Sequence, residues 1–148
     1  MILVKHAQGA PGLRLFGLGS NYQPMHGIQK LKNLFDRNAF WAEKRSITNL
    51  KVMLSHSDVI VSIWMDRNII AFGRATTDRS FRATLWDVVV DKEFQAIGLG
   101  KLIVESILEN ALISEVEKVY LMTTNCKSFY ESLNFKKEIK QTLMFYNI

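Results

Sequence analysis

Cysteine and proline are scarce in this sequence. Its 148 residues contain one cysteine, Cys126, two prolines and three scattered histidines. A single cysteine excludes an internal disulfide, and the spacing that a cysteine and histidine zinc site requires is absent. We therefore expect a protein of a reducing compartment that uses no metal.

Long apolar runs and blocks of like charge are also missing. The apolar start of the chain ends at Lys5, whereas a signal peptide needs about 7 to 15 apolar residues and a membrane span about 20. The formal net charge is +5, but the basic residues are scattered. Because nucleic-acid-binding tails carry runs of like charge, we expect a soluble protein with neither a nucleic acid nor a membrane as its partner.

The composition indicates one compact domain over residues 1–148. Hydrophobic residues make up 48% of the chain, and a domain of this length buries about two thirds of its unfolded surface. Glycine and proline recur through residues 1–20, including Gly17 and Gly19, and disfavour regular structure there. We therefore expect residues 1–12 to form a loose N-terminal arm.

The pattern of apolar residues predicts two helices, then paired strands, then strands separated by helices. Helical spacing covers residues 27–41 and 46–57, with Ser46 as a possible N-cap, and a turn at 66–68 joins two β-rich runs into a hairpin. The remaining predicted elements are strands at 58–65, 69–78, 80–90, 117–124 and 142–147, and helices at 98–113 and 126–133. This order predicts an α/β protein of the α+β type, with a mixed, mainly antiparallel sheet and helices on both faces.

Two glycines, Gly98 and Gly100, stand where a valine-rich strand gives way to a helix. The dinucleotide fingerprint would need a third glycine at Ile103, and the phosphate-loop motif would need one at Gln95. Both motifs are therefore excluded. The amides of a first helical turn still carry partial positive charge, and a missing Cβ lets a phosphate approach them closely. The alternative is that the glycines only allow close packing between helix and strand.

Residues 95–100, Gln-Ala-Ile-Gly-Leu-Gly, resemble the acetyl-CoA signature Gln/Arg-x-x-Gly-x-Gly/Ala of the GNAT superfamily of N-acetyltransferases. The similarity runs from Phe40 to Asn147 through "FGRATTD", "WDVVV", "VYLMTT" and "FYESLNF". These phrases are similar to the cyanobacterial and plastid branch that includes plant chloroplast serotonin and lysine N-acetyltransferases. The sequence departs from the family's pattern at two positions, since Ala96 and Asn134 stand where many relatives have glycine. The second departure is mild, because asparagine tolerates left-handed dihedral angles.

The resemblance implies a splay between the fourth and fifth strands, where the pantetheine arm of acetyl-CoA inserts as a false strand. Main-chain groups of the valine run would hold its amides, and the signature would hold its pyrophosphate. The cofactor-binding residues implied in this way are Val88, Val89, Val90, Gln95, Ala96, Ile97, Gly98, Leu99, Gly100, Lys101 and, less directly, Asn125. The valines also suit a strand that is buried on both faces.

Acetyl transfer to an amine needs a neutral nucleophile, a stabilised oxyanion and a proton for the departing thiolate. The resemblance implies that Tyr130 protonates the thiolate and that a main-chain N–H near Val88 or Val89 holds the oxyanion. Asp87, in an otherwise apolar strand, is a candidate base, directly or through water. Alternatively, Asp87 pairs with Arg74 or Arg82, and a water chain accepts the proton.

The predicted function is therefore acetyl-CoA-dependent N-acetylation of a primary amine by direct attack in a ternary complex. The acceptor is an arylalkylamine such as serotonin or tryptamine, or a protein lysine, and Trp86 is either an aromatic platform or core. The alternative is a catalytically silent acetyl-CoA sensor. The resemblance also implies a plastid or a cyanobacterial cytoplasm. The N-terminal residues lack the serine-rich and arginine-rich character of a transit peptide.

Overall fold

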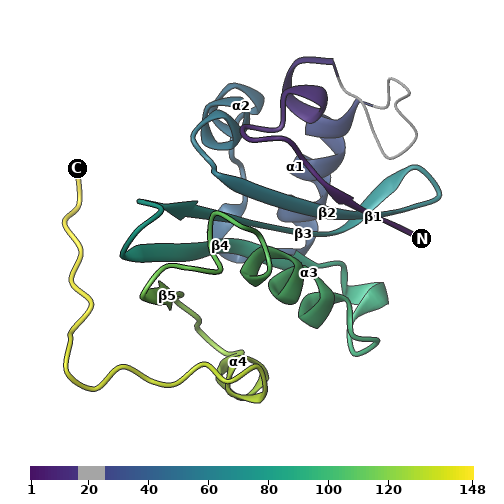
Figure 1. Cartoon of the computed structure of the whole chain (residues 1–148). Helices are drawn as coiled ribbons and strands as arrows, with labels where there is room; N and C mark the ends of the chain where they lie inside the picture. Colours follow the sequence, from purple (N-terminus) through teal and green to yellow (C-terminus); the bar gives the residue numbers. More distant parts are fainter. Residues whose placement is uncertain (17–25) are drawn as a thin grey trace.

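A computed structural model of the chain describes residues 1–16 and 26–148 (Figure 1). Gly17 and Gly19 lie outside the described residues. One five-stranded sheet has the order β1-β2-β3-β4-β5, with antiparallel pairing from β1 to β4 and parallel pairing between β4 and β5. The strands are β1 (Ile2–Lys5), β2 (Val59–Met65), β3 (Asn68–Thr77), β4 (Arg82–Val90) and β5 (Lys118–Tyr120).

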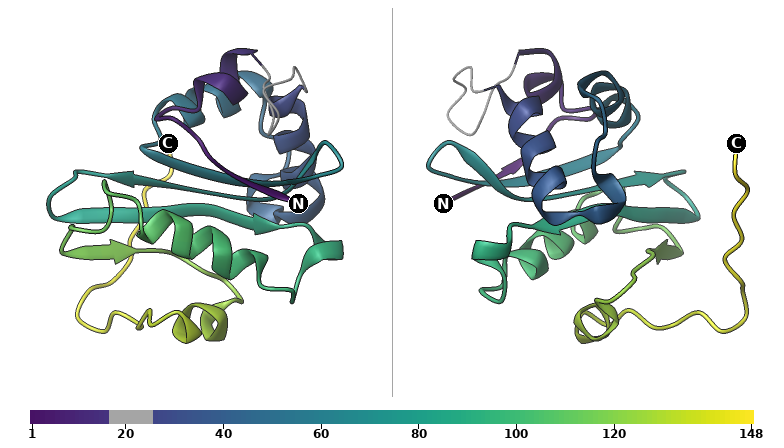
Figure 2. Two further views of the ribbon diagram at one scale, coloured as in Figure 1. Left: turned by 45° about the vertical axis from the view of Figure 1, so that its right-hand side comes forward. Right: turned by 180° about the vertical axis from the view of Figure 1, so that it is seen from behind.

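Helices cover both faces of this sheet (Figure 2). One apolar core lies between the sheet and the first two long helices, and a second lies between the sheet and α3. The helices are η1 (Gly12–Phe16), α1 (Gly27–Asn38), η2 (Phe40–Ala42), α2 (Ile47–Ser55), η3 (Lys92–Phe94), α3 (Leu99–Leu108) and α4 (Lys127–Ser132). The predicted fold class is therefore confirmed.

Local signals in the sequence predicted several element boundaries correctly. The Ser46 hydroxyl accepts a hydrogen bond from the Asn49 amide at 3.1 Å and caps α2. Asp66 and Arg67 both have positive φ, as a two-residue hairpin turn requires. Asn134 follows the end of α4 and has a φ of 67. It therefore takes the left-handed conformation at a position where many relatives have glycine.

The prediction of a loose arm over residues 1–12 was wrong. Ile2–Lys5 form β1, which pairs with β2 in antiparallel register, and the His6 amide then donates to the Ile60 carbonyl at 3.0 Å. Leu13 is fully buried. The glycines and proline lie beyond this strand, so they shape the turn into η1 and leave β1 free to pair.

The predicted strand at 142–147 was also wrong. These residues have no regular structure, and the side chains of Leu143 to Tyr146 are between 72% and 90% exposed. Figure 1 shows this C-terminal segment lying apart from the sheet. High β-propensity alone does not form a strand, because a strand needs a neighbour with which to pair. No helix within the described ranges has the length and hydrophobicity to cross a bilayer.

His6 should make the stability of the fold sensitive to mild acid. Its Nε2 lies 2.8 Å from the Ser62 hydroxyl, which also accepts a hydrogen bond from the Trp64 indole N–H. Burial lowers the pKa of His6 to about 4. An unfolded histidine has a pKa of about 6.5, so the unfolded chain binds a proton first as the pH falls. The free energy of unfolding should fall by up to about 3 kcal/mol between pH 6.5 and pH 4.

Urea unfolding at pH 7.0 and at pH 5.0 tests this expectation. His6→Gln should remove most of the difference between the two pH values, because glutamine can donate to Ser62 without titrating. His56→Gln is the matched control, since His56 is exposed and bonds within its own helix end. An equal pH dependence in wild type and His6→Gln would show that His6 is not its source.

Candidate active site

The sheet opens between β4 and β5. Residues 82–84 of β4 pair in parallel with residues 118–120 of β5, and β4 then continues to Val90 with no partner in β5. Among the described residues, the part of β4 from Leu85 onward therefore pairs with β3 alone. This confirms the predicted splay, and the run Val88 to Val90 lies on its β4 side.

A bulge in β4 lies within the splayed part. Arg74 pairs with Trp86 and Phe72 pairs with Val89, so Gly73 alone faces two residues of β4, Asp87 and Val88. Asp87 has a positive φ of 52. Because one extra residue shifts the alternation of side chains, Val89 joins the core under α1 and α2, while Val88 packs against the core under α3.

Gly73 lets α3 approach the sheet directly beneath this bulge. A Cβ at this position would lie 2.5 Å from Cγ2 of Ile103 and 3.5 Å from Cγ2 of Val88. A side chain there would push the helix away from the strand. The close approach fixes α3 against the splayed part of β4.

The connection from β4 to α3 exposes the start of the helix. Ala96 and Gly98 both have left-handed φ values, 63 and 90, and residues 95–98 are exposed. Gly98 is the N-cap of α3, and apart from its two chain neighbours no described residue has an atom within 4 Å of a Cβ built on it. Where left-handed and right-handed backbone conformations alternate along the chain, successive N–H groups point to the same side. Such a group of N–H donors suits an anion. The space above Gly98 is open for one.

Gly100 has a different role from Gly98. A Cβ on Gly100 would lie 3.2 Å from Cζ of Phe129 and 3.7 Å from Cγ2 of Val90. Gly100 therefore allows α4 to pack on the first turn of α3 beside the end of β4. The packing interpretation of the two glycines accounts for Gly100, and it leaves the open conformation of Gly98 unexplained.

The other signature residues lie around this helix start. Leu99 is buried and anchors the helix, whereas Ile97 is 62% exposed. The side-chain amide of Gln95 donates to the Val90 carbonyl at 3.2 Å and folds back over the end of β4. Lys101 is exposed, and its Nζ lies 3.7 Å from Oε1 of Glu105 on the next turn of the helix.

Asn125 lies apart from the signature, in the exposed connection before α4. Its side-chain carbonyl accepts a hydrogen bond from the thiol of Cys126 at 3.4 Å. The structure therefore gives Asn125 a local hydrogen-bond partner. Within the described ranges, no group of three or more histidine, cysteine or acidic residues is placed to hold a metal.

Tyr130 lies on α4 in a mostly apolar setting. Its ring packs edge-on against Phe129 and Phe135, with centroid distances of 4.9 and 5.8 Å. Burial, and to a lesser degree the nearby thiol of Cys126, raises the pKa of Tyr130 to about 12. Since Phe129 contacts the first turn of α3, α4 borders the start of that helix. Tyr130 is therefore a protonated phenol at the edge of the site.

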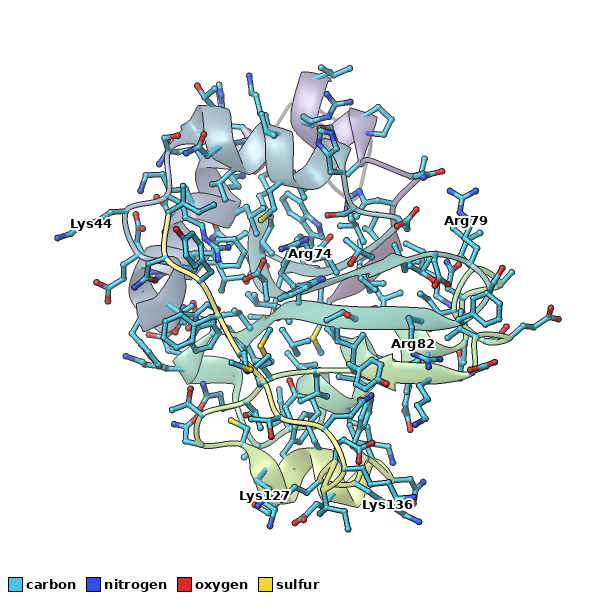
Figure 3. All side chains as sticks on the ribbon, turned by 90° about the vertical axis from the view of Figure 1, so that its left-hand side faces the viewer. Lys44, Arg74, Arg79, Arg82, Lys127 and Lys136 are labelled. Carbon is cyan, nitrogen blue, oxygen red and sulfur yellow. The ribbon has the colours of Figure 1, made fainter. Side chains whose placement is uncertain are left out.

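Asp87 lies between two arginines on the side of the sheet that α1 and α2 cover. Its Oδ2 is 2.8 Å from Nε of Arg74, and its Oδ1 is 3.1 Å from Nη1 of Arg45. Arg82, the other partner that the sequence offered, pairs instead with Glu117 at 2.7 Å. Figure 3 shows Arg82 set apart from Arg74. Arg45 was missed, because no local motif connects residues 42 positions apart.

Comparison with known proteins agrees with this geometry. The sequence profile of the acetyltransferase (GNAT) domain matches residues 56–137. An uncharacterized N-acetyltransferase, ycf52, of Porphyra purpurea is 34% identical over an alignment of 116 residues, and the match covers 75% of this chain and 66% of that protein. GCN5-related N-acetyltransferase 1, chloroplastic, of Arabidopsis thaliana is 33% identical, covering 73% of this chain and 55% of that protein. The chain thus spans about half to two thirds of these relatives.

A solved structure shows the same fold. An acetyltransferase of the GNAT family from Streptococcus pneumoniae superposes with a TM-score of 0.72 at 18% identity, covering 99% of this chain and 98% of that one. At this identity the likeness extends to the fold alone. The match of the domain profile to more than half of the chain, together with the plastid and cyanobacterial relatives, shows that the chain belongs to the GNAT acetyltransferase family.

Proposed function

We propose that this protein transfers the acetyl group of acetyl-CoA directly to a primary amine within a ternary complex. The observation that carries the proposal is the open helix start at Gly98, next to the splay between β4 and β5. An anion site and a free strand edge side by side suit a ligand that has a diphosphate at one end and an amide-rich arm at the other.

GNAT enzymes use acetyl-CoA, and the residues of this chain fit it. Main-chain N–H groups between Gln95 and Lys101 would hold the pyrophosphate, since Gly98 leaves room above them. Main-chain groups of Val88 and Val90 would pair with the pantetheine amides as a neighbouring strand does. The carbonyl of Val90 accepts from the Gln95 side chain, so this side chain must move if that carbonyl serves the ligand.

The chain supplies two groups for the chemistry. The amine nitrogen attacks the thioester carbonyl, the new C–N bond forms and the C–S bond breaks. A main-chain N–H at Val88 or Val89 stabilises the charge on the carbonyl oxygen. Tyr130 donates its phenolic proton to the leaving sulfur and then regains a proton from water, and its raised pKa keeps the resting phenol protonated across the neutral range.

The proton of the acceptor amine goes to water in this proposal. The sequence left open whether Asp87 accepts it or is paired in the fold. Each of its oxygens accepts a hydrogen bond from a guanidinium, and its side chain is 5% exposed. This arrangement favours pairing, so we assign no side-chain base.

The relatives and the site suggest candidates for the acceptor and the compartment. Protein lysine is one candidate, because a relative in Glycine max is named histone acetyltransferase TAP1. An arylalkylamine such as serotonin or tryptamine is the other, for which Trp86 offers a half-buried indole. The plastid and cyanobacterial relatives suggest an origin in a plastid or a cyanobacterium, and hence the stroma or the cytoplasm.

A thiol-release assay tests the proposal. Purified protein is incubated with acetyl-CoA and serotonin, tryptamine or a lysine-containing peptide, and free thiol is measured with time. Saturable release with one amine class identifies the acceptor. Release with none of them, together with saturable acetyl-CoA binding, would instead support the silent sensor and would contradict the enzymatic proposal.

A further inference from the structure

We propose that Asp87, Arg74 and Arg45 are positioning residues that hold the bulge of β4 in the shape that acetyl transfer needs. The inference depends on the proposed function. It assigns Asp87 an indirect role: the carboxylate acts through the backbone of its own strand. The three side chains form one cluster on the α1 and α2 side of the sheet, with Asp87 at its centre.

Arg74 fixes the cluster to β3. Its Nε is 2.8 Å from Oδ2 of Asp87, its Nη1 is 3.3 Å from the Ser57 hydroxyl, and its guanidinium lies 5.7 Å from the ring of Trp86. Its side chain is 14% exposed. Hydrogen bonds on two sides and a ring beside the guanidinium leave Arg74 little freedom to move.

Arg45 ties the cluster to the segment between η2 and α2. Its Nη1 is 3.1 Å from Oδ1 of Asp87, and its guanidinium lies 5.5 Å from the ring of Phe35. The neighbouring residues are held as well, since the Lys44 amide donates to Asp36 and Ser46 caps α2. Arg45 therefore connects a fixed segment of the helical layer to the bulge.

The cluster and the bulge depend on each other. In a regular strand, Asp87 would point to the opposite face from Trp86, into the apolar core beneath α3. The extra residue turns Asp87 to the face that holds both arginines, and it turns Val88 toward α3. Since an unpaired carboxylate is costly in an apolar core, the arginines select the bulged register. That register sets the direction of the main-chain N–H next to Asp87, at Val88 or Val89, that is proposed to stabilise the oxyanion.

A double-mutant cycle separates positioning from general-base catalysis. Asp87→Asn removes the carboxylate and leaves one carbonyl oxygen for the guanidinium groups of Arg74 and Arg45, so its amide N–H₂ opposes a donor whichever way it turns. Adding Arg74→Gln provides an acceptor for that amide and rebuilds a neutral pair without a carboxylate. The kcat, the KM for acetyl-CoA and the melting temperature are measured for wild type, both single variants and the double variant.

We expect Asp87→Asn to lower kcat by about 30-fold with the KM for acetyl-CoA within about twofold, and the double variant to recover at least about fivefold of that loss. Arg82→Gln is the matched control, because Arg82 also lies on β4 but forms its ion pair with Glu117, outside the cluster. This variant should leave kcat unchanged. If Asp87 were the base, the double variant would be no more active than Asp87→Asn. That result would overturn the inference.

A second variant covers the case in which the double variant does not fold. Arg45→Gln removes one ion pair at a side chain that is 31% exposed, so it should fold. We expect it to lower kcat by about tenfold at an unchanged KM for acetyl-CoA. A kcat within twofold of wild type would also overturn the inference. Failure of the proposed function is a distinct outcome, since the wild type itself would then release no thiol.

Discussion

Replacing Gly98 by aspartate should weaken acetyl-CoA binding by about 100-fold to 1,000-fold while the protein stays folded. The carboxylate would stand at the start of α3, where the diphosphate is proposed to lie. A like charge at about 4 Å near a protein surface opposes binding by about 3 to 4 kcal/mol. The φ of 90 at Gly98 strains any side chain, so stability should fall by about 1 to 2 kcal/mol, although aspartate tolerates left-handed φ better than most residues and its charge suits a helix N-terminus.

Gly98→Asn separates charge from shape. Asparagine has nearly the same volume and the same tolerance of left-handed φ, so it should weaken binding by only about 3-fold to 10-fold. Titration calorimetry gives both dissociation constants, and thermal unfolding checks the fold. Equal affinities for the aspartate and asparagine variants would show that no anionic group binds at Gly98.

Replacing Tyr130 by phenylalanine should lower kcat by about 100-fold, which is within the usual range for the loss of a general acid. The phenyl ring keeps the contacts with Phe129 and Phe135, so the fold and the acetyl-CoA affinity should persist. Because the pKa of Tyr130 is raised to about 12, the wild type should show no loss of kcat from this residue up to about pH 10.

Tyr120→Phe is the control for this substitution. Tyr120 lies on β5, and its hydroxyl donates to Gln141 at 3.3 Å, so its removal should leave kcat within about twofold. Steady-state thiol release at saturating acetyl-CoA measures both variants. A Tyr130→Phe enzyme with the turnover of wild type would remove the proposed role of this phenol.

The features that the sequence predicted correctly depend on neighbouring residues. The Ser46 cap, the hairpin turn at Asp66 and Arg67, and the helix start at Gly98 each involve residues within a few positions of one another. Backbone preferences and local hydrogen bonds determine such features, so a short stretch contains the information. The helix start at which we propose an anion site could therefore be predicted before the fold was known.

The features that the sequence missed depend on distant residues. β1 forms because residues 2–5 meet the edge of β2, which lies nearly sixty residues further along the chain. The residues at 142–147 have the same apolar, β-prone character and lie outside the sheet. The Arg45 partner of Asp87 is likewise set by the way α1 and α2 lie over β4. Hydrophobic periodicity and β-propensity carry no information on contacts between residues that are far apart in the sequence.

The central claim is that the free amides at the start of α3 bind the diphosphate of acetyl-CoA. Titration calorimetry of the purified protein with acetyl-CoA and with S-acetylpantetheine, which lacks the diphosphate, tests it most directly. The account predicts saturable heat and a raised melting temperature with acetyl-CoA, and binding at least about 100-fold weaker with the truncated thioester. Equal affinities for the two thioesters, or no heat with acetyl-CoA, would contradict it.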